Sequence, residues 1–584
     1  MPKVAILGGG VGGLSAAHEL IERGFDVEVY ERRDVPGGKA RSFYTPPEKD
    51  WKLGLPAEHG FRFFPGFYRH VTDTMSRIAS FDSGKTVFEN LVETTELALA
   101  RFNKEPVALP TRLPGSLDEL VRELERLLHA DLPKLEPGEI AYYAERIWQI
   151  LTSCHARRDD EYERTGWWDF IGAEQRSEAY QTYLGNLSRT LVAANPRRVS
   201  TRTNGNVFVQ MLLDFGRIGV QVDRVLNGPT NEVWIHPWVE QLVRRGCRYF
   251  LNTKVTALQC SGGRITGATI TPLADAPMFG GPAEAVRVLE CGRYAVTRSE
   301  PLATKSPFTV EADYYVSALP VEAMAALVSD DLRGAEPSLG RLPALAESTA
   351  WMNGMLFYLA ADVKVVHGHT IYVDHPWALT SISQRQFWEP GNPIARYADG
   401  RVGGILSIDV SNWREIEGTM DGARPAYLCT PEEIANYTWE YVRRCVPQLE
   451  GTQPLYHVLD PAIGGMLDWL REHGGSPKSA GSAGPGGTPD YLYSEKVRNL
   501  EPLLVNEVNT WSLRPDAYTR IPNLFLASDY VRTNTDLATM EAANEAARRA
   551  VNGVLDACGS DRPRCQIWPL HQPPLLAPFR PHHH

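Results

Sequence analysis

The chain has 584 residues, of which 43% are hydrophobic and 22% are charged, and its formal net charge is −11. This is a globular composition, long enough for several domains around a large core. An acidic chain lacks the basic surface of a general nucleic-acid binder, so we expect no nucleic-acid partner.

The first forty residues predict one β-α-β unit. Residues 4–7 form an apolar run that suits a buried parallel strand. Glycines follow, and apolar residues at helical spacing then continue until Gly24, which ends the helix. Residues 27–30 predict the second strand, which ends at Glu31.

The turn of this unit carries a dinucleotide-binding pattern, with Gly8, Gly10 and Gly13 in GxGxxG spacing. The first glycine permits a tight turn, the second lets the backbone approach a pyrophosphate, and the third lets the helix pack closely on the sheet. Glu31 lies 18 residues after Gly13, where a carboxylate is expected to accept hydrogen bonds from ribose hydroxyls. The Glu31 carboxylate disfavours a 2′-phosphate, so NADP is not expected at this site. FAD and NAD both remain as alternatives for the cofactor.

Later segments are less specific. Residues 113–151 predict helices, and the amphipathic stretch 117–128 suits either core packing or a membrane surface. Residues 248–270 predict a hairpin that turns at 261–263, and residues 312–320 predict a buried strand ended by proline. The Gly/Ser/Pro-rich stretch 474–489 predicts a flexible surface loop, and a proline-rich tail follows residue 559.

Several classes of site and location are not expected. The eight cysteines lie far apart with no CxxC pair, which favours reduced thiols over zinc or redox sites. No run reaches the ~18 apolar residues of a membrane span, and residues 1–10 do not resemble a signal peptide. We therefore expect a cytoplasmic protein without a metal, and we assign no metal role to the histidines at 582–584.

A second glycine pair, Gly37-Gly38, follows Glu31 and is succeeded by Lys39 and Arg41. This arrangement resembles the GG-doublet flavoproteins, which include amine oxidases and phytoene desaturases, although Lys39 stands where the family usually has arginine. The segment 58–68, EHGFRFFPGFY, is similar to that of plant-type phytoene and zeta-carotene desaturases and of hydroxysqualene dehydroxylases.

Two C-terminal segments extend the resemblance. Residues 521–530 resemble the family's flavin strand, in which the aspartate binds the ribityl chain, and residues 538–547 resemble the helix whose N-terminus faces the flavin. The resemblance implies non-covalently bound FAD and a contact set of Gly8, Gly10, Gly12, Gly13, Glu31, Arg32, Gly37, Gly38, Lys39, Ala40, Arg41, Val255, Asp529, Thr539 and Met540. Arg41 is expected along the pyrophosphate or the flavin.

The resemblance also implies the architecture, a Rossmann-like α/β FAD-binding domain interleaved with an α+β substrate domain. The predicted FAD-binding parts are 1–112, 229–330 and 496–558. The predicted substrate parts are 113–228 and 331–495, and the tail is 559–584. The active site is expected as a buried cavity between the two domains.

Candidates for catalysis are few. His59 and Arg62 lie on the segment that runs beside the flavin in this family, so either could polarise a hydroxyl or move a proton. Trp511 and Arg514 precede the flavin strand, where the superfamily often places cavity walls, and Trp511 is the predicted cavity aromatic.

The resemblance favours an FAD-dependent oxidoreductase that removes hydride from a hydrophobic, isoprenoid or polyene-like substrate, with oxygen or a quinone as electron acceptor. Three alternatives stay open. They are a flavin amine or amino-acid oxidase, a redox-neutral isomerase or cyclase, and a non-enzymatic binder of prenylated proteins. Peripheral membrane contact also stays open.

Overall fold

The computed structural model describes most of the chain. The stretch 117–128, the low-complexity segment 474–489, Cys291 and the C-terminal histidines lie outside the described residues. The described residues are 2–45, 54–60, 62–80, 84–111, 135–186, 189, 194–215, 217, 220–273, 278–279, 287–288, 294–295, 306–388, 390, 393–415, 424–465 and 497–580.

A six-stranded sheet forms the centre of the first domain, in the order β14-β11-β2-β1-β18-β28. β1 (Lys3–Leu7) pairs in parallel with β2 (Asp26–Tyr30) and with β18 (Tyr314–Ser317). β11 (Arg248–Phe250) and β28 (Leu524–Leu526) extend it in parallel, and β14 (Met278–Phe279) adds an antiparallel edge. Stretches far apart in sequence therefore build one sheet, and the predicted Rossmann-like fold is confirmed.

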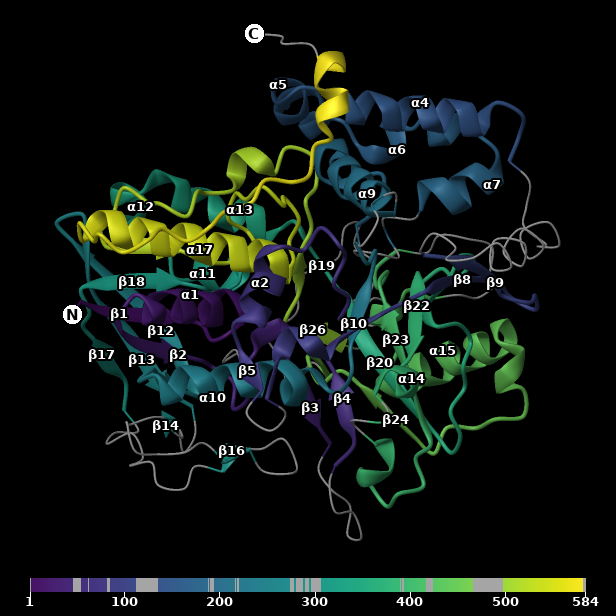
Figure 1. The fold of residues 1–584 in the computed structure, drawn as a ribbon, viewed down its shortest axis with the longest axis horizontal. Helices are drawn as coiled ribbons and strands as arrows, with labels where there is room; N and C mark the ends of the chain where they lie inside the picture. The colour runs from purple at the N-terminus through teal and green to yellow at the C-terminus, as the bar shows by residue number, and fades with distance from the viewer. Residues whose placement is uncertain are drawn as a thin grey trace, which may run out of the picture.

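Helices α1 (Val11–Glu22), α10 (His236–Arg244) and α17 (Met540–Ala557) lie beside one another along this sheet (Figure 1). A smaller antiparallel sheet completes the domain, with β12 (Thr253–Ser261), β13 (Arg264–Pro272) and β17 (Phe308–Val310). The predicted hairpin at 261–263 is thus confirmed.

The close packing of helix on sheet predicted to require Gly13 is present in the structure. A Cβ on Gly13 would lie 1.9 Å from the carbonyl oxygen of Gly8, so only glycine lets α1 start this close to β1. Gly8 itself has a φ of +104°, a left-handed conformation that favours glycine.

A seven-stranded mixed sheet forms the second domain, at the right of Figure 1, where its later strands are green and β8 and β9 are blue. It contains β24 (Tyr456–Leu459), β20 (Asn353–Leu359), β23 (Gly404–Val410), β22 (Leu379–Ser383), β21 (Gly368–Tyr372), β8 (Glu96–Ala100) and β9 (Val107–Pro110), in that order. Only β21 and β8 pair in parallel among these described strands. Helix α15 (Pro431–Cys445) packs its apolar side against this sheet.

A helical part follows β9 in the chain and has its own core. It contains α4 (Glu139–Leu151), α6 (Trp167–Phe170), α7 (Glu178–Tyr180) and α9 (Thr201–Phe215). Ile147, Trp167, Tyr180 and Val209 are buried together in it.

Two predicted domain boundaries differ from the structure. Residues 96–110 fall in the predicted first FAD-binding part, but β8 and β9 belong to the seven-stranded sheet because β8 pairs with β21. Residues 331–346 fall in the predicted substrate domain, yet α12 (Asp330–Ala335) and α13 (Leu342–Ala346) bury leucines in the core of the first domain. Nothing local in the sequence distinguishes these packing partners.

The C-terminal tail packs against both the first domain and the helical part. Cys565 and Leu570 join the core of the first domain, and the Trp568 backbone N–H donates to His70 Nε2 (2.9 Å). Farther along, the ring of Phe579 packs edge-on against Trp148 of α4. The tail thereby connects the first domain to the helical part, where Figure 1 places its end.

None of the described helices is long and apolar enough to cross a bilayer, and no cluster of His, Cys, Asp and Glu among the described residues could hold a metal. The seven described cysteines are all free.

We predict that Gly13→Ala lowers the free energy of unfolding by about 1–3 kcal/mol, the usual cost of overpacking a closely packed site. The added methyl has no room beside the Gly8 carbonyl. Thermal unfolding measures the change. Gly334→Ala is the matched control, because a Cβ there meets nothing within 4 Å, and it should leave stability unchanged or higher. Equal stability of the two variants would contradict the prediction.

Candidate FAD and substrate site

A cavity of about 720 Å³ lies between the two domains, within the range of small-molecule and cofactor sites. It extends from the carboxyl ends of β1 and β2 to the seven-stranded sheet. Most of the predicted FAD-contacting residues line it: Gly8, Gly10, Gly12, Glu31, Arg32, Gly37, Gly38, Lys39, Ala40, Val255, Asp529, Thr539 and Met540. Their contacts with FAD itself remain predictions.

Two glycine turns form one cradle at the nucleotide end. Gly10 and Gly37 make a backbone bridge, and a Cβ on Gly38 would lie 2.9 Å from the Gly10 Cα. Beside them Glu31 is buried, and it accepts hydrogen bonds from the backbone N–H groups of Gly9 and Arg33 (2.8 Å each). A carboxylate has about four acceptor sites, so capacity for ribose hydroxyls remains.

Arg41 does not line the cavity, contrary to its predicted place along the cofactor. Its Nη1 donates to Glu501 Oε2 (2.6 Å) and to the Gly38 carbonyl (3.0 Å), so it braces the glycine turn from behind. Burial would raise the pKa of Glu501, but Arg41, His59 and Arg33 outweigh it and hold that pKa well below its ordinary value. Glu501 is therefore charged, and it lines the cavity.

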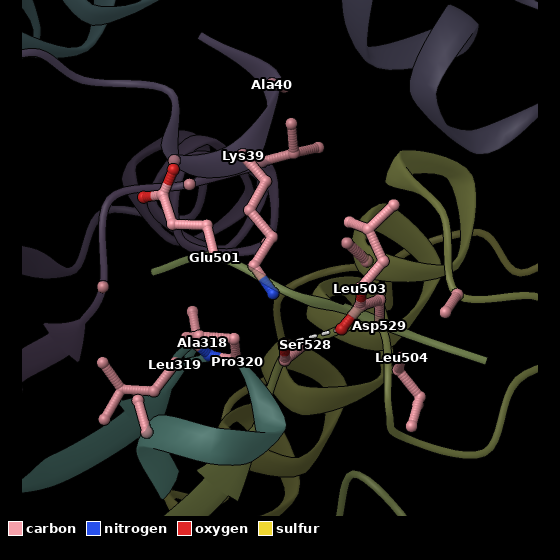
Figure 2. Close-up of a pocket in the computed structure, with 18 of the residues that line it drawn as sticks. Lys39, Ala40, Ala318, Leu319, Pro320, Glu501, Leu503, Leu504, Ser528 and Asp529 are labelled. Carbon is pink, nitrogen blue, oxygen red and sulfur yellow. Dashed lines mark hydrogen bonds between the residues drawn. The ribbon is translucent and has the colours of Figure 1, made fainter. Parts of the chain in front are cut away.

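Lys39 fills the position where the family usually has arginine. Its Nζ lies 3.2 Å from Glu322 Oε1 and donates to the carbonyl of Pro502. Figure 2 shows its side chain extending from one wall of the pocket toward the wall with Ser528 and Asp529. The cation is thus held inside the cavity among acidic groups.

His59 lines the cavity as predicted, with its ring buried against acids. Its Nδ1 lies 2.5 Å from Asp460 Oδ2 and 3.7 Å from Glu501 Oε2. Asp460 is itself anchored by Asn353 Nδ2 (2.7 Å) and by the backbone N–H of Ala462 (3.0 Å). A histidine fixed against a carboxylate at a cavity wall is suited to proton transfer.

Arg62 also lines the cavity, but its guanidinium is engaged with backbone. It donates to the carbonyls of Lys39 (2.7 Å), Gly60 (2.5 Å) and Ala40 (3.3 Å). This geometry favours a positioning role in which Arg62 ties segment 58–62 to the glycine turn.

Trp511 is not among the residues that line the cavity, contrary to its prediction as a cavity aromatic. The guanidinium of Arg202 lies 3.4 Å above its ring centroid, and Arg514 and Arg532 also face the ring. These three cations, of which Arg202 comes from a distant segment, hold the indole behind the cavity wall.

The N-terminus of α17 closes the other end of the cavity. Thr539 caps this 18-residue helix by accepting a hydrogen bond from the Ala542 N–H (3.3 Å), and Thr539 and Met540 line the cavity. Glu541 points away and accepts the backbone N–H groups that open α2 (His70–Ser76), which fixes the first turn. The positive end of the helix dipole therefore faces the cavity.

Sequence reasoning missed the acids Asp409, Asp460 and Glu501. Asp409 is buried on β23, lines the cavity, and lies 3.3 Å from the position that a Cβ on Gly60 would take. A carboxylate in a mostly apolar strand, GILSIDV, is the signal that could have pointed to it.

These features fit FAD. The glycine cradle leaves room for a pyrophosphate, the acid at the end of β2 suits a ribose, and a helix N-terminus faces the opposite end. The described residues could hold the group without covalent attachment.

The family model of flavin containing amine oxidoreductases matches residues 11–555. Zeta-carotene desaturase from Capsicum annuum is 37% identical over 78 residues, 13% of this chain and 12% of that protein. Probable polyamine oxidase 4 from Arabidopsis thaliana is 27% identical over 135 residues, covering 22% and 25%. The chain thus spans about an eighth of the length of the zeta-carotene desaturase and a quarter of that of the polyamine oxidase.

Solved structures share the fold over nearly the whole chain. A putrescine oxidase bound to putrescine has a TM-score of 0.56 at 12% identity, over 95% of this chain and 99% of that one. Cyclohexylamine oxidase from Brevibacterium oxydans has a TM-score of 0.55 at 13% identity, over 96% and 99%. These likenesses establish the architecture.

We predict that the stability of the protein depends on pH through Glu58, at the end of β4 (Pro56–Glu58). Burial raises its pKa from 4.5 to about 7, although Arg62 and Thr230 oppose the shift. The folded state therefore keeps a proton that the unfolded state releases above pH 4.5, so stability falls as the pH rises toward 7. The loss is about 3 kcal/mol at ~1.4 kcal/mol per pKa unit.

Glu58→Gln should remove this component, because the amide stays neutral and can still bond Thr230. Denaturant unfolding of both proteins between pH 5 and 8 measures it. The difference in stability between wild type and variant should change with pH, and a constant difference would contradict the assignment.

The described geometry and the family match agree on the cofactor, since a dinucleotide site in a flavin-containing family is a site for FAD. The chain belongs to the flavin containing amine oxidoreductase family and is an FAD-dependent oxidoreductase.

Proposed function

We propose that this enzyme removes a hydride from a C–H bond of a hydrophobic, isoprenoid or polyene-like substrate. The supporting observation is the apolar wall of the cavity where it leaves the glycine cradle. That wall is formed by Phe63, Tyr68, Ala194, Val199, Met352, Leu503, Leu504, Val505 and Leu537. An apolar chain would be bound there by burial of surface and not by specific polar contacts.

The chemistry divides between cofactor and protein. FAD, when bound, accepts the hydride and its electron pair. The protein holds the C–H bond in place, keeps water away with the apolar wall, and favours negative charge through the α17 N-terminus. To form a C=C bond, a neighbouring carbon must also lose a proton to a base.

Asp409 and His59 are the candidate bases. Both are buried side chains at the cavity wall; His59 precedes Gly60 in the chain, and Asp409 faces Gly60 from the seven-stranded sheet. His59 is in contact with Asp460, and Asp409 lies on β23 of this sheet. Asp409 is therefore better placed to reach a substrate that lies along this sheet.

A second function is favoured by the same residue. A buried carboxylate in an apolar cavity would also pair with the ammonium group of an amine substrate, and polyamine oxidases are among the relatives. The proposed location is cytoplasmic, with oxygen or a quinone as acceptor and with peripheral contact to a membrane that supplies the substrate.

Anaerobic titration of the FAD-loaded protein tests the proposal. Carotene-type and squalene-type isoprenoids in liposomes are added first, followed by a panel of amines and amino acids, while the visible absorbance of oxidised flavin is recorded. Bleaching by an isoprenoid is the expected result. Bleaching by amines alone would overturn it in favour of the oxidase. A converted isoprenoid without bleaching would indicate a redox-neutral reaction.

We predict that Asp409→Asn slows isoprenoid-dependent bleaching by about 10²–10⁴-fold, the usual contribution of a positioned acid or base. FAD binding should be unchanged. Ser407→Ala is the control, because Ser407 is buried two residues away on the same strand and does not line the cavity. Rapid-mixing absorbance measures both rates. Equal rates in the two variants would exclude Asp409 as the base.

A further inference from the structure

The loop between β28 and α17 carries a large share of the cavity wall. We define it as the cofactor loop, residues 527–539. It contributes Ala527, Ser528 and Asp529 from its first part and Leu537, Ala538 and Thr539 from its last part. The conformation of both parts therefore decides where the flavin-facing groups lie.

Arg514 holds the first part of the cofactor loop by its carbonyl groups. Its Nε donates to the Tyr530 oxygen (2.9 Å), and its Nη2 donates to the oxygens of Val531 (2.8 Å) and Asp529 (3.2 Å). The remaining Nη1 donates to Asp536 Oδ1 (2.7 Å). One fully buried guanidinium thus joins the two parts of the loop.

Asp536 holds the last part in an unusual conformation. Its φ is +48°, in the left-handed region that few residues other than glycine, asparagine and aspartate adopt. Its carbonyl accepts a hydrogen bond from Asn506 Nδ2 (3.3 Å), and Asn506 Oδ1 accepts the Ala538 N–H (3.3 Å). Asn506 itself lines the cavity, so the loop and the opposite wall are fixed together.

The helical part reaches the same carboxylate. Arg202, on the first turn of α9, donates through Nη1 to Asp536 Oδ2, and Thr203 Oγ1 donates to that oxygen as well (3.0 Å). Just before α9, the Ser200 N–H donates to the Asn506 carbonyl (3.0 Å), and Val199 lines the substrate side of the cavity. The apolar wall at Val199 and the cofactor loop are therefore both held through contacts with Asp536 and Asn506.

We infer that Asp536 is a positioning residue for the FAD site, and that Arg202 acts on that site through Asp536. The carboxylate is buried between two guanidinium groups, and Asp536 is not among the residues that line the cavity. Removing it leaves two buried cations without their shared partner and frees the loop to leave its left-handed turn. The inference rests on the cofactor and not on the identity of the substrate.

The experiment measures the dissociation constant of FAD, from the fluorescence of released flavin, together with thermal unfolding of each apoprotein. The variants are Asp536→Asn, Arg202→Gln and the double variant. Asparagine keeps the size and the tolerance for positive φ, so Asp536→Asn changes chiefly the charge. Arg548→Lys is the control, because Arg548 is equally buried and bonds Asp73 and Asn544 without lining the cavity.

Asp536→Asn is expected to weaken FAD binding by about 10–100-fold. This is the loss of affinity that follows when a residue supporting the ligands of a bound metal is removed, and Asp536 supports the cofactor loop in the same indirect way. Arg202→Gln should weaken it less, and the double variant should bind FAD as Asp536→Asn does, because Arg202 has then lost the group through which it acts. Arg548→Lys should lower thermal stability and leave FAD binding unchanged.

Two results would overturn the inference. One is a loss of stability in Asp536→Asn with wild-type FAD binding, which would make Asp536 a purely structural residue. The other is an additive effect in the double variant, which would separate Arg202 from Asp536. If Asp536→Asn fails to fold, Arg202→Gln alone tests the inference, because Asp536 keeps its ion pair with Arg514 in that variant. Wild-type FAD binding by Arg202→Gln would then overturn the inference.

Discussion

The cofactor site depends on the contact of three backbone segments with no side chains between them. Residues 8–13 touch the glycine pair 37–38 on one side, where Gly38 faces Gly10. On the other side a Cβ on Gly12 would lie 2.0 Å from the carbonyl oxygen of Ala527, at the start of the cofactor loop. Because the segments meet at van der Waals distance, a shift in any of them moves the whole cradle.

Buried charge organises the walls around that contact. Arg41, Arg62 and Arg514 each direct a guanidinium at backbone carbonyls or an acid, so they stiffen loops that have no regular hydrogen-bonding partner. The cost of burying them is offset by acids such as Glu501 and Asp536. Asp409, on β23, is a further buried carboxylate that lines the cavity.

Much of the nucleotide half could be predicted from the sequence, because its determinants are local. Gly8, Gly10 and Glu31 act within one β-α-β unit, and spacing alone relates them. Asp460 and Glu501 could not be found this way, since each meets His59 or Arg41 only after distant segments pack. The predicted place of Trp511 in the cavity rested on analogy, and its ring instead faces three arginines, of which Arg202 comes from a distant segment. The pairing of β8 with β21 likewise depends on contacts across some 270 residues.

The order in which the central sheet is assembled has a consequence for synthesis on the ribosome. The strand β28 is made after more than 520 residues, and α17 and the tail that packs on His70 follow it. The edge of β18 that pairs with β28, and the side of α1 that packs against α17, therefore stay uncovered while most of the seven-stranded sheet emerges. Such non-local closure makes folding slow and leaves intermediates prone to aggregation. Binding of FAD, which needs the cofactor loop, then belongs to the last stage of folding and marks its completion.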